Sequence, residues 1–550
     1  MHGFFCLCRY HIGEQCISAL AYAHNQDREL MQVTSPKAIT LSVQLTFISI
    51  LYALLLLSAS VTQAQNERET QYHFEAGGLL SSAQTPFWLR ANQYGIVPLK
   101  GPVLRLQGGI RSDYRLADST GYRPKTDWGY VVDAVTNVGV TNQFILPEAH
   151  IKGRLGAFEL YIGRKREVIG LVDTLMTSGA YAWSGNALPI PKIQIGLYQY
   201  TPIPFTKGVL SFLGAYAHGW FEIAGRLIKG SYLHQKYVYG RLGKPTWPFR
   251  LYGGFNHEVI WGGQADPGIL SNLIAVNGKL PSTLPYYLPM VLGLRGQGDR
   301  NDPNVTSLED NRIGNHLGSI DLGADVNLRD WNLYAYRQFV YDDGSLFYGT
   351  NLADGLNGLR LKNRRGSSGE PFFLQQITVE YLYTKSQGGS EFVIEDPELR
   401  GQDNYFNHSQ FIDGWTYFGR TIGTPFLTPS FEARPNLPGS RGIVNNRVSA
   451  VNVGASALLA GKVQVTTRLS LSQNSGLYIA PFPNELTQFS GLLTAAFPIS
   501  LFGGSVLSSS LGVDRGGLLP NSVGLYVGLR KTGLLSRNRA VVPDRNPLQR

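Results

Sequence analysis

Cysteine is scarce in this chain of 550 residues, and its three copies, Cys6, Cys8 and Cys16, all stand close to the first residue. A small secreted domain stapled by disulfide bonds is therefore excluded. The paired cysteines of structural zinc sites and the HExxH pair of zinc hydrolases do not occur. Basic helices, zinc-finger spacing and RNP-type signatures are also missing, so nothing indicates nucleic-acid binding. We expect no metal and no cofactor.

Charge and long hydrophobic runs are also in short supply. Charged residues make up 16% of the chain, against about 25% in an average soluble protein. Only one long apolar run occurs, between residues 39 and 64, so a bundle of membrane-spanning helices of ~20 apolar residues each is excluded. The chain is rich instead in glycine and aromatics, with 63 Gly, 29 Tyr and 26 Phe. This composition predicts a large all-β protein.

The single hydrophobic run has the features of a secretory signal peptide. A lysine precedes it, Thr62 and Ala64 place small residues at its exit, and a polar stretch follows. We interpret residues 31–64 as the signal and residues 1–30 as an upstream extension. An N-terminal membrane anchor is the alternative. Export without cysteine favours a large structure held by hydrogen bonds rather than by disulfides.

Residues 462–474 show a pattern that recurs through the rest of the chain. Alternate positions carry apolar or methyl-bearing side chains, and the positions between them are polar. The first set is Val463, Val465, Thr467, Leu469 and Leu471, and the second is Gln464, Thr466, Arg468, Ser470 and Ser472. Because side chains alternate across a strand, this segment is expected to have one apolar and one polar face.

Segments with this alternation recur along the chain, each of roughly 8–14 residues, which is the length that crosses a bilayer as a tilted strand. They are 104–111, 128–140, 145–154, 156–164, 193–201, 208–218, 232–242, 249–261, 320–329, 331–341, 373–385, 451–459, 463–472, 489–498, 504–514 and 522–530. At roughly 25 residues per strand and connection, the chain holds on the order of 16–20 strands.

The connections between these segments are of two kinds. Some are tight, such as 460–461, while 264–315, 342–371 and 395–441 are long and rich in Pro, Gly and Asn. Short turns at one end and long loops at the other are typical of outer-membrane β-barrels. A β-propeller is the structural rival, but no blade-length repeat is found.

Three parts follow the signal in the predicted organisation: a helical, periplasmic segment at 65–100, a transmembrane β-barrel at 101–531 and a basic tail at 532–550. In the first part, Thr85 and Pro86 resemble the N-cap and first residue of a short helix. The tail contributes much of the net charge of +10, and we interpret it as a solvated end.

Four carboxylates are candidates for acid–base chemistry. Asp342, Asp343, Glu380 and Asp403 could supply the paired acids of a glycoside hydrolase, which lie ~5–9.5 Å apart. The alternative is that they face Arg and Lys side chains across a barrel lumen. No GxSxG elbow, P-loop or GxGxxG after a strand occurs. We therefore predict a protein that is not an enzyme.

Segments that mix Trp, Tyr and His with Asn, Asp and Arg point to carbohydrate contact. A sugar presents an apolar C–H face and a rim of hydroxyls, which aromatic rings and polar side chains match. The aromatic girdles of a membrane barrel need the same Tyr and Trp residues, so that alternative stays open. We expect the contacts to face the lumen or the loops. The candidates are His218, Trp220, His234, Lys236, His257, Trp261, Arg337, Asp403 and His408.

A series of short motifs runs from about residue 72 to 430. They are Thr85-Pro86-Phe87-Trp88, Asn92-Gln93-Tyr94-Gly95, Tyr161-Ile162-Gly163-Arg164-Lys165, Ser184-Gly185-Asn186, Ala217-His218-Gly219-Trp220, Leu233-His234-Gln235-Lys236, His257 with Trp261-Gly262-Gly263, Tyr405-Phe406-Asn407-His408 and Gly423-Thr424-Pro425-Phe426. In this order they resemble the Wzi-type capsule assembly family, in the version found in Bacteroidetes-like bacteria. The resemblance implies an outer-membrane barrel of about 18 strands with a small periplasmic helical part, and a lectin-like role in holding surface polysaccharide.

These observations together predict a non-enzymatic outer-membrane barrel of a Gram-negative bacterium that binds and helps retain or assemble capsular polysaccharide or exopolysaccharide. Its expected partners are that polysaccharide and outer-membrane lipid, with no nucleic acid, and it is expected to be a monomer. Two other functions stay open. One is a diffusion porin or polysaccharide export channel, which an open lumen would favour, and the other is a secreted glycoside hydrolase.

Overall fold

The computed structural model describes residues 68–115, 123–294, 305–306, 312–342, 345–366, 369–393, 401–439 and 441–536. The predicted signal peptide, Asp343 and residues 537–550 of the predicted tail lie outside the described residues. In the described part of the chain, each helix is too short or too polar to cross a membrane.

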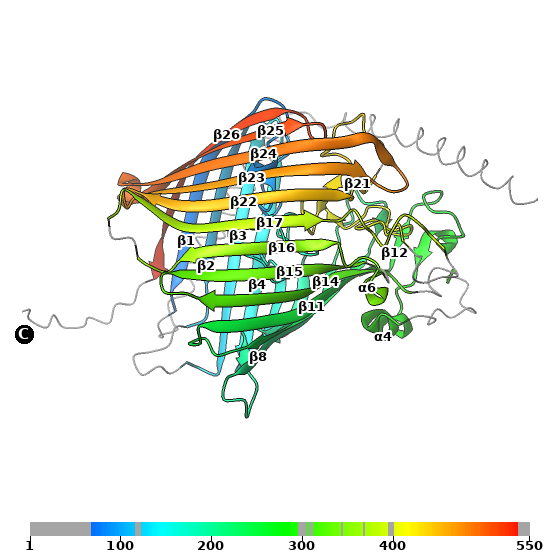
Figure 1. Cartoon of the computed structure of the whole chain (residues 1–550), viewed down its shortest axis with the longest axis horizontal. Helices are drawn as coiled ribbons and strands as arrows, with labels where there is room; N and C mark the ends of the chain where they lie inside the picture. The colour runs from blue at the N-terminus through cyan, green and yellow to red at the C-terminus, as the bar shows by residue number, and fades with distance from the viewer. Residues whose placement is uncertain are drawn as a thin grey trace, which may run out of the picture. The chain divides into compact units, whose positions relative to one another are not determined.

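Antiparallel strands form one sheet that closes on itself (Figure 1). Within the described residues the wall has 18 strands, and the short β7 (Thr201–Pro202) extends β6 along β8. The strands are β1 (Thr70–Ser81), β2 (Val103–Ser112), β3 (Thr126–Gly139), β4 (Gln143–Leu155), β5 (Phe158–Arg164), β6 (Lys192–Leu197), β8 (Leu210–Trp220), β10 (Tyr232–Leu242), β11 (Phe249–Trp261), β14 (Asn315–Asn327), β15 (Trp331–Asp342), β16 (Gly355–Asn363), β17 (Phe372–Tyr383), β22 (Val448–Leu459), β23 (Val463–Gly476), β24 (Pro481–Ile499), β25 (Ser505–Gly516) and β26 (Ser522–Ser536). The predicted large antiparallel barrel of about 18 strands is confirmed.

The first and last strands close the barrel. β1 pairs with β26 from Thr70, opposite Ser536, to Ser81, opposite Gly524. On its other side β1 pairs with β2, so this seam leaves no strand edge unpaired. Backbone N–H and C=O groups are thereby satisfied within the wall, as a lipid environment requires.

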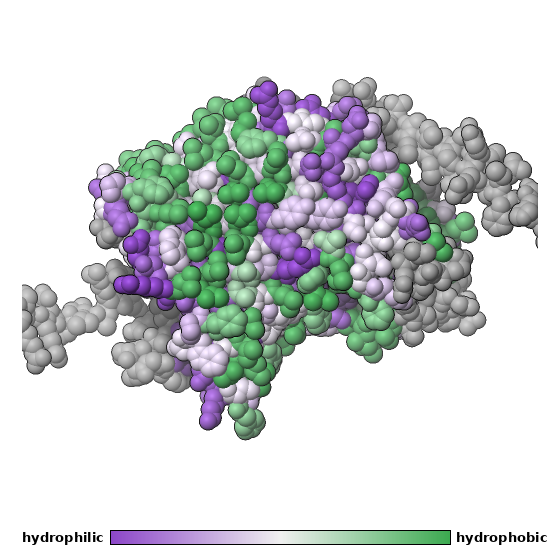
Figure 2. All heavy atoms as spheres, in the orientation of Figure 1, coloured by the Kyte–Doolittle hydropathy of each residue, from purple (hydrophilic) through white to green (hydrophobic). Residues whose placement is uncertain are grey.

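β23 shows how the period of two sorts side chains between the faces of the wall. Leu469 and Leu471 are exposed on the outside, whereas Ser470 and Ser472 are buried, which confirms the alternation predicted for residues 462–474. Figure 2 shows a broad area of hydrophobic residues over the left and central part of the wall, with hydrophilic residues at its left edge, at its centre and at the upper right. A closed barrel with an apolar exterior spans lipid, so this protein is an outer-membrane β-barrel.

The two ends of the barrel differ in their connections. Short turns, such as 156–157 and 460–462, lie at the end where β1 begins and β26 stops. Short turns mark the periplasmic end of such barrels. The long connections that carry α4 (Leu284–Leu292), α6 (Ser345–Tyr348) and β12 (Gly263–Ala265) gather at the opposite, extracellular end (Figure 1).

The barrel begins earlier than the predicted boundary at residue 101. β1 belongs to the wall because its alternate residues, such as the exposed Phe74 and Leu80, face outward. The short helix α3 (Phe87–Arg90) follows β1, so it lies at the extracellular end and not on the periplasmic side. Pro86 occupies the N-cap position, and the Thr85 hydroxyl instead donates to the Pro98 carbonyl at 2.8 Å.

Two further segments differ from the prediction. β16 lies inside the stretch 342–371 that was predicted to be a loop, because its Asn and Lys residues hide the alternation. β26 extends to Ser536, so the first residues of the predicted tail belong to the wall.

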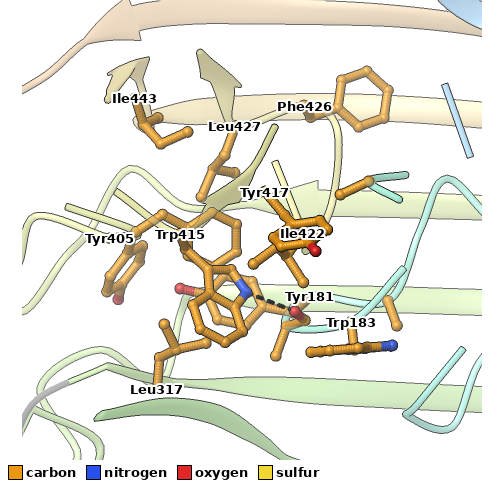
Figure 3. Packing of buried hydrophobic residues seen from close by; sticks show 14 of the residues in the cluster. Tyr181, Trp183, Leu317, Tyr405, Trp415, Tyr417, Ile422, Phe426, Leu427 and Ile443 are labelled. Carbon is orange, nitrogen blue, oxygen red and sulfur yellow. Dashed lines mark hydrogen bonds between the residues drawn. The ribbon is translucent and has the colours of Figure 1, made fainter. Parts of the chain in front are cut away.

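Three extracellular connections, 82–102, 165–191 and 401–447, fold into the lumen, and we call them the plug. Trp88 Nε1 donates to the Ser470 hydroxyl at 3.0 Å, and the Tyr181 backbone N–H donates to Gln338 Oε1 at 2.9 Å. Trp415 Nε1 donates to the Ala182 carbonyl at 2.8 Å, which joins two plug segments (Figure 3). Buried side chains of all three segments form one core that includes Phe87, Trp88, Tyr181, Trp183, Tyr405, Phe406, Trp415, Tyr417, Phe426 and Leu427.

Small elements complete the connections. They are β9 (Ile228–Lys229), η1 (Val276–Gly278), β13 (Lys279–Leu280), β18 (Thr416–Tyr417), β19 (Arg420–Thr421), β20 (Thr428–Pro429), β21 (Ile443–Asn445) and, in a periplasmic turn, η3 (Leu501–Gly503). β18 pairs with β19 and β20 with β21 inside the plug segment 401–447.

Candidate functional site

Carboxylates on the inner wall hold the plug segment 165–191. Glu380 accepts hydrogen bonds from the Thr177 hydroxyl at 2.6 Å and from the Ser178 backbone N–H at 2.5 Å. Asp321 accepts the Leu171 backbone N–H at 2.8 Å. All three donor groups belong to buried residues and cannot reach water. Each carboxylate therefore supplies the hydrogen-bond acceptor that these donors would otherwise lack. Glu380 thus has a structural position in the lumen.

The segment 401–447 is held in the same way. Asp354, on the loop before β16, accepts the Gln387 backbone N–H and the Tyr405 hydroxyl, each at 2.7 Å. Burial raises the pKa of Asp354, although these hydrogen bonds oppose the shift. Arg90 of α3 forms a buried ion pair with Glu432. The plug segments therefore lock to the wall and to one another.

A cavity of about 490 Å³ lies in the lumen below residues 168–172 of the plug. This volume lies within the ~300–1,000 Å³ range of small-molecule sites. Six tyrosines and several charged groups line the cavity, which we call the tyrosine cavity. The tyrosines are Tyr198, Tyr200, Tyr237, Tyr239, Tyr252 and Tyr334, and the charged residues are Glu159, Lys165, Glu167, Asp325 and Arg360.

The aromatic rings form a continuous row along one side of the tyrosine cavity. The ring centroid of Tyr252 lies 5.8 Å from that of Tyr200 and 6.2 Å from that of Tyr334. Guanidinium groups lie over both ends of the row, with Arg241 5.2 Å from Tyr200 and Arg360 5.1 Å from Tyr334. Within the described residues, the hydroxyls of Tyr200 and Tyr334 have no hydrogen-bond partner and are free to bind a ligand.

Glu167 lies at the top of the cavity between two lysines. Its carboxylate oxygens are 2.8 Å from Lys192 Nζ and 3.4 Å from Lys165 Nζ, and the Tyr161 hydroxyl donates to it at 2.9 Å. Burial raises the pKa of Glu167, but the two ammonium groups outweigh burial and lower this pKa to about 2. A carboxyl group that stays ionised at neutral pH cannot act as a general acid.

The other charges of the cavity are also paired. Asp325 lies 2.9 Å from Arg250, and Glu159 lies 2.9 Å from Lys165. Arg360 lies 3.6 Å from Asp173. Arg241, which lies over Tyr200 but does not line the cavity, donates to the Ser211 hydroxyl at 3.1 Å and has no carboxylate partner in the described part of the chain. The cavity thus offers flat rings and free hydroxyls, with one cation beside it, a set suited to binding.

The tyrosine cavity lies toward the periplasmic end of the lumen. Tyr200 follows the periplasmic end of β6, and Tyr334 and Arg360 stand near periplasmic turns. The plug segment 165–191 lies between the cavity and the extracellular loops. The plug therefore separates the cavity from the extracellular loops.

Six of the predicted contact residues lie on the outer face of the wall, so the expectation of a lumen position is wrong for them, although several contact the long connection that carries α4. On β10, Gln235 and Tyr239 face inward, as their bonds to Lys192 and Asp321 show, so alternate positions between them face outward. The six outward residues are His218, Trp220, His234, Lys236, His257 and Trp261.

The helix α4 covers part of this outward group. Lys236 Nζ donates to the Val291 carbonyl at the C-terminal end of α4. His257 Nε2 lies 3.0 Å from His316 Nδ1, and the His218 ring centroid lies 5.1 Å from that of Trp220. In the described residues, no group of three or more His, Cys, Asp or Glu side chains is arranged to hold a metal ion.

The remaining three candidates lie on other elements, β15 and the plug. Arg337 also faces outward and donates to Asn357 Oδ1 at 2.9 Å. The buried Asp403 and the half-buried His408 belong to the plug segment 401–447, where His408 Nδ1 accepts the Gln410 backbone N–H at 3.2 Å. Asp342 accepts the Phe406 backbone N–H at 3.1 Å. The structure therefore does not bring the nine candidates into one site.

The tyrosines of the cavity were missed by sequence reasoning, although a signal was present. Tyr198 and Tyr200, Tyr237 and Tyr239, and Tyr334 and Tyr336 are pairs spaced by two residues. Such spacing puts both rings of a pair on one face of a strand. Two of these pairs lie on β10 and β15 and the third directly follows β6, so the spacing could have predicted an aromatic patch.

No family model and no curated protein matches the chain. Among solved structures, it is similar to Wzi of Escherichia coli, described as an outer membrane protein involved in group 1 capsule assembly and as a carbohydrate-binding β-barrel. The TM-score is 0.53 at 13% identity, with 83% of this chain and 84% of that chain covered. OpdQ of Pseudomonas aeruginosa gives a TM-score of 0.44 at 9% identity, with 86% and 100% covered. The likeness to Wzi shows a Wzi-like barrel fold, and membership of the Wzi-type family stays a prediction.

Proposed function

We propose that this protein is a non-enzymatic outer-membrane barrel that binds carbohydrate in its tyrosine cavity. Its natural ligand is a capsular polysaccharide or exopolysaccharide, which the protein helps to retain or assemble at the cell surface as a monomer. The observation that carries the proposal is a lumen occupied by the plug, with the tyrosine cavity left beneath it.

The chemistry of the cavity matches a sugar. The ring row centred on Tyr252 offers flat apolar area for C–H faces, and the hydroxyls of Tyr200 and Tyr334 can bond sugar hydroxyls. Nearly balanced charge favours a neutral or weakly acidic sugar, because the charged side chains that line the cavity are ion-paired and the one cation over its ring row, Arg241, has no carboxylate partner within the described residues. The carbohydrate-binding description of the similar Escherichia coli barrel agrees with this ligand class.

Calorimetric titration of the detergent-solubilised protein tests the proposal, with neutral, N-acetylated and acidic hexasaccharides as probes. We expect one probe class to bind, and Tyr252→Ala to weaken that binding about tenfold through loss of ring contact. Tyr381→Ala is the matched control, since Tyr381 is an exposed residue of β17 outside the cavity. Absence of binding by every probe, or equal loss in both variants, would overturn the proposal.

A diffusion porin or export channel is the competing function, and conductance separates the two. The plugged barrel is expected to carry no steady ionic current in a planar bilayer, because buried side chains of the plug pack against those of the wall. A stable current that oligosaccharides block would favour the channel instead.

A further inference from the structure

The helix α4 packs on the outside of the barrel and not in the lumen. Tyr286, Met290 and Val291 on one of its faces are buried in a cluster with Val259 and Trp261 of the outer wall. The Tyr287 hydroxyl also lies 2.6 Å from the hydroxyl of Tyr216, an exposed residue of β8. One side of the helix is thus fixed to the wall near its extracellular end.

The opposite side of α4 is an exposed row of leucines. Leu284, Leu288 and Leu292 are 83%, 62% and 56% exposed, and their spacing of four places them on one face of the helix. The helix contains no charged residue at all. In Figure 2 the surface at the position that α4 occupies in Figure 1, at the lower right, includes hydrophobic residues.

We propose that this leucine face inserts into the outer leaflet of the outer membrane, so that the partner of α4 is lipid. The apolar exterior of the same strands runs up to the helix without a break, since Val238 and Phe255 are exposed on the wall below it. Tyr216 and Trp220 stand at the level of the helix, as the aromatic girdle of a barrel does at the membrane interface. Short apolar helices with aromatic neighbours lie in that interface.

The imidazoles of His234, His257 and His316 show how fully α4 covers this part of the wall. All three point outward, yet all three are buried, and the His234 ring centroid lies 6.3 Å from that of Tyr287. The leucine face of α4 therefore replaces this part of the wall as the surface that meets the surroundings.

A single-cysteine label tests the proposal in the full barrel. The described residues contain no cysteine, so with the three N-terminal cysteines replaced by serine, Leu288→Cys carries one environment-sensitive fluorophore. The probe membrane is a phosphatidylethanolamine–phosphatidylglycerol vesicle. Phe255→Cys on the wall is the lipid control, and Leu273→Cys, 83% exposed on the same connection, is the water control.

We expect the label at residue 288 to show the blue-shifted emission of the label at 255 and quenching by acyl-chain nitroxides. Emission and iodide quenching that match the label at 273 would overturn the proposal. Protection from both quenchers with cross-linking between copies would also overturn it, because a second copy would then cover the face. If Leu288→Cys does not fold, Leu292→Cys on the same face carries the label. The result is independent of carbohydrate binding.

Discussion

Single buried carboxylates decide where the plug lies. Glu380 and Asp321 project from β17 and β14 and accept backbone N–H groups of the segment 165–191. A backbone N–H buried in the lumen costs about 1–3 kcal/mol when it has no partner. The wall therefore offers acceptors at positions that match the path of a loop far away in sequence. Glu167 differs, since it is a plug residue held by lysines.

The ion pairs of Glu167 predict a pH dependence of stability. Its pKa is lowered from 4.5 for a free glutamate to about 2 in the folded protein, so the ionised carboxylate of Glu167 stabilises the fold above pH 4.5. This stability is lost as pH falls from 4.5 through 2, because the unfolded chain takes up the proton first. Glu167→Gln, which cannot ionise, is expected to melt at a lower temperature than the wild type at pH 7.

Near-ultraviolet circular dichroism in detergent measures both melting temperatures. The difference between the melting temperatures of the wild type and Glu167→Gln should shrink as the pH is lowered from about 5 to about 2.5. This range covers most of the interval between the pKa of Glu167 in the unfolded chain and its pKa in the folded protein. A difference that stays constant over this window would show that the carboxylate is not stabilised by Lys165 and Lys192.

At the scale of elements, the plug is a set of loops that behaves as a core. Trp415 and Tyr181 are fully buried, and the Trp183 and Trp415 rings lie 6.3 Å apart (Figure 3). The wall does not need this core to connect its strands, because Tyr383 at the end of β17 pairs directly with Ser449 of β22. We therefore expect the wall to form even when part of the plug is deleted.

Replacing residues 385–446 by a two-residue Asn-Gly turn tests that separation. A turn of this kind suits the antiparallel pair β17–β22, so the barrel is expected to close with part of its plug removed. Ionic current in a planar bilayer should appear in this variant and not in the wild type. A shorter replacement that removes only 434–439 keeps Trp415 and serves as control. If the deletion variant folds but carries no current, the two remaining plug segments are sufficient to close the lumen.

At the scale of the whole molecule, one seam between distant residues completes the barrel. Tyr526 of β26 crosses over Gly77 of β1, where an added Cβ would lie 2.3 Å from its hydroxyl. The Tyr526 hydroxyl in turn bonds Glu75 at 2.5 Å and Arg105 at 2.7 Å. The neighbouring Gly78 has open space around it. Closure of the barrel at this seam therefore requires glycine at position 77 but not at position 78.

Gly77→Val is expected to weaken closure, by about 1–3 kcal/mol for an overpacked contact. Closed barrels resist unfolding in detergent, so unheated and heated samples migrate differently on a gel. The temperature at which the fast-migrating form disappears should fall for Gly77→Val and stay near that of the wild type for Gly78→Val. Equal behaviour of the two variants would show that Tyr526 moves aside without cost.

Alternation of residues by itself determined that this chain is a large antiparallel barrel with an apolar exterior. The reason is physical, since a strand such as β23 that is apolar on one face only can bury that face in lipid. The missed strands β1 and β16 are those in which glycine, asparagine and lysine blur the period.

Only the tertiary structure decided what fills the lumen and which face carries the candidate residues. β10 has tyrosines and polar groups on both faces, so its period of two fixes that His234 and Tyr239 lie on opposite sides but not which side is inside. That choice follows from contacts far away in sequence, such as the bond from Tyr239 to Asp321 and the cover of α4 over His234. Local spacing holds no information about partners that the chain brings together only on folding.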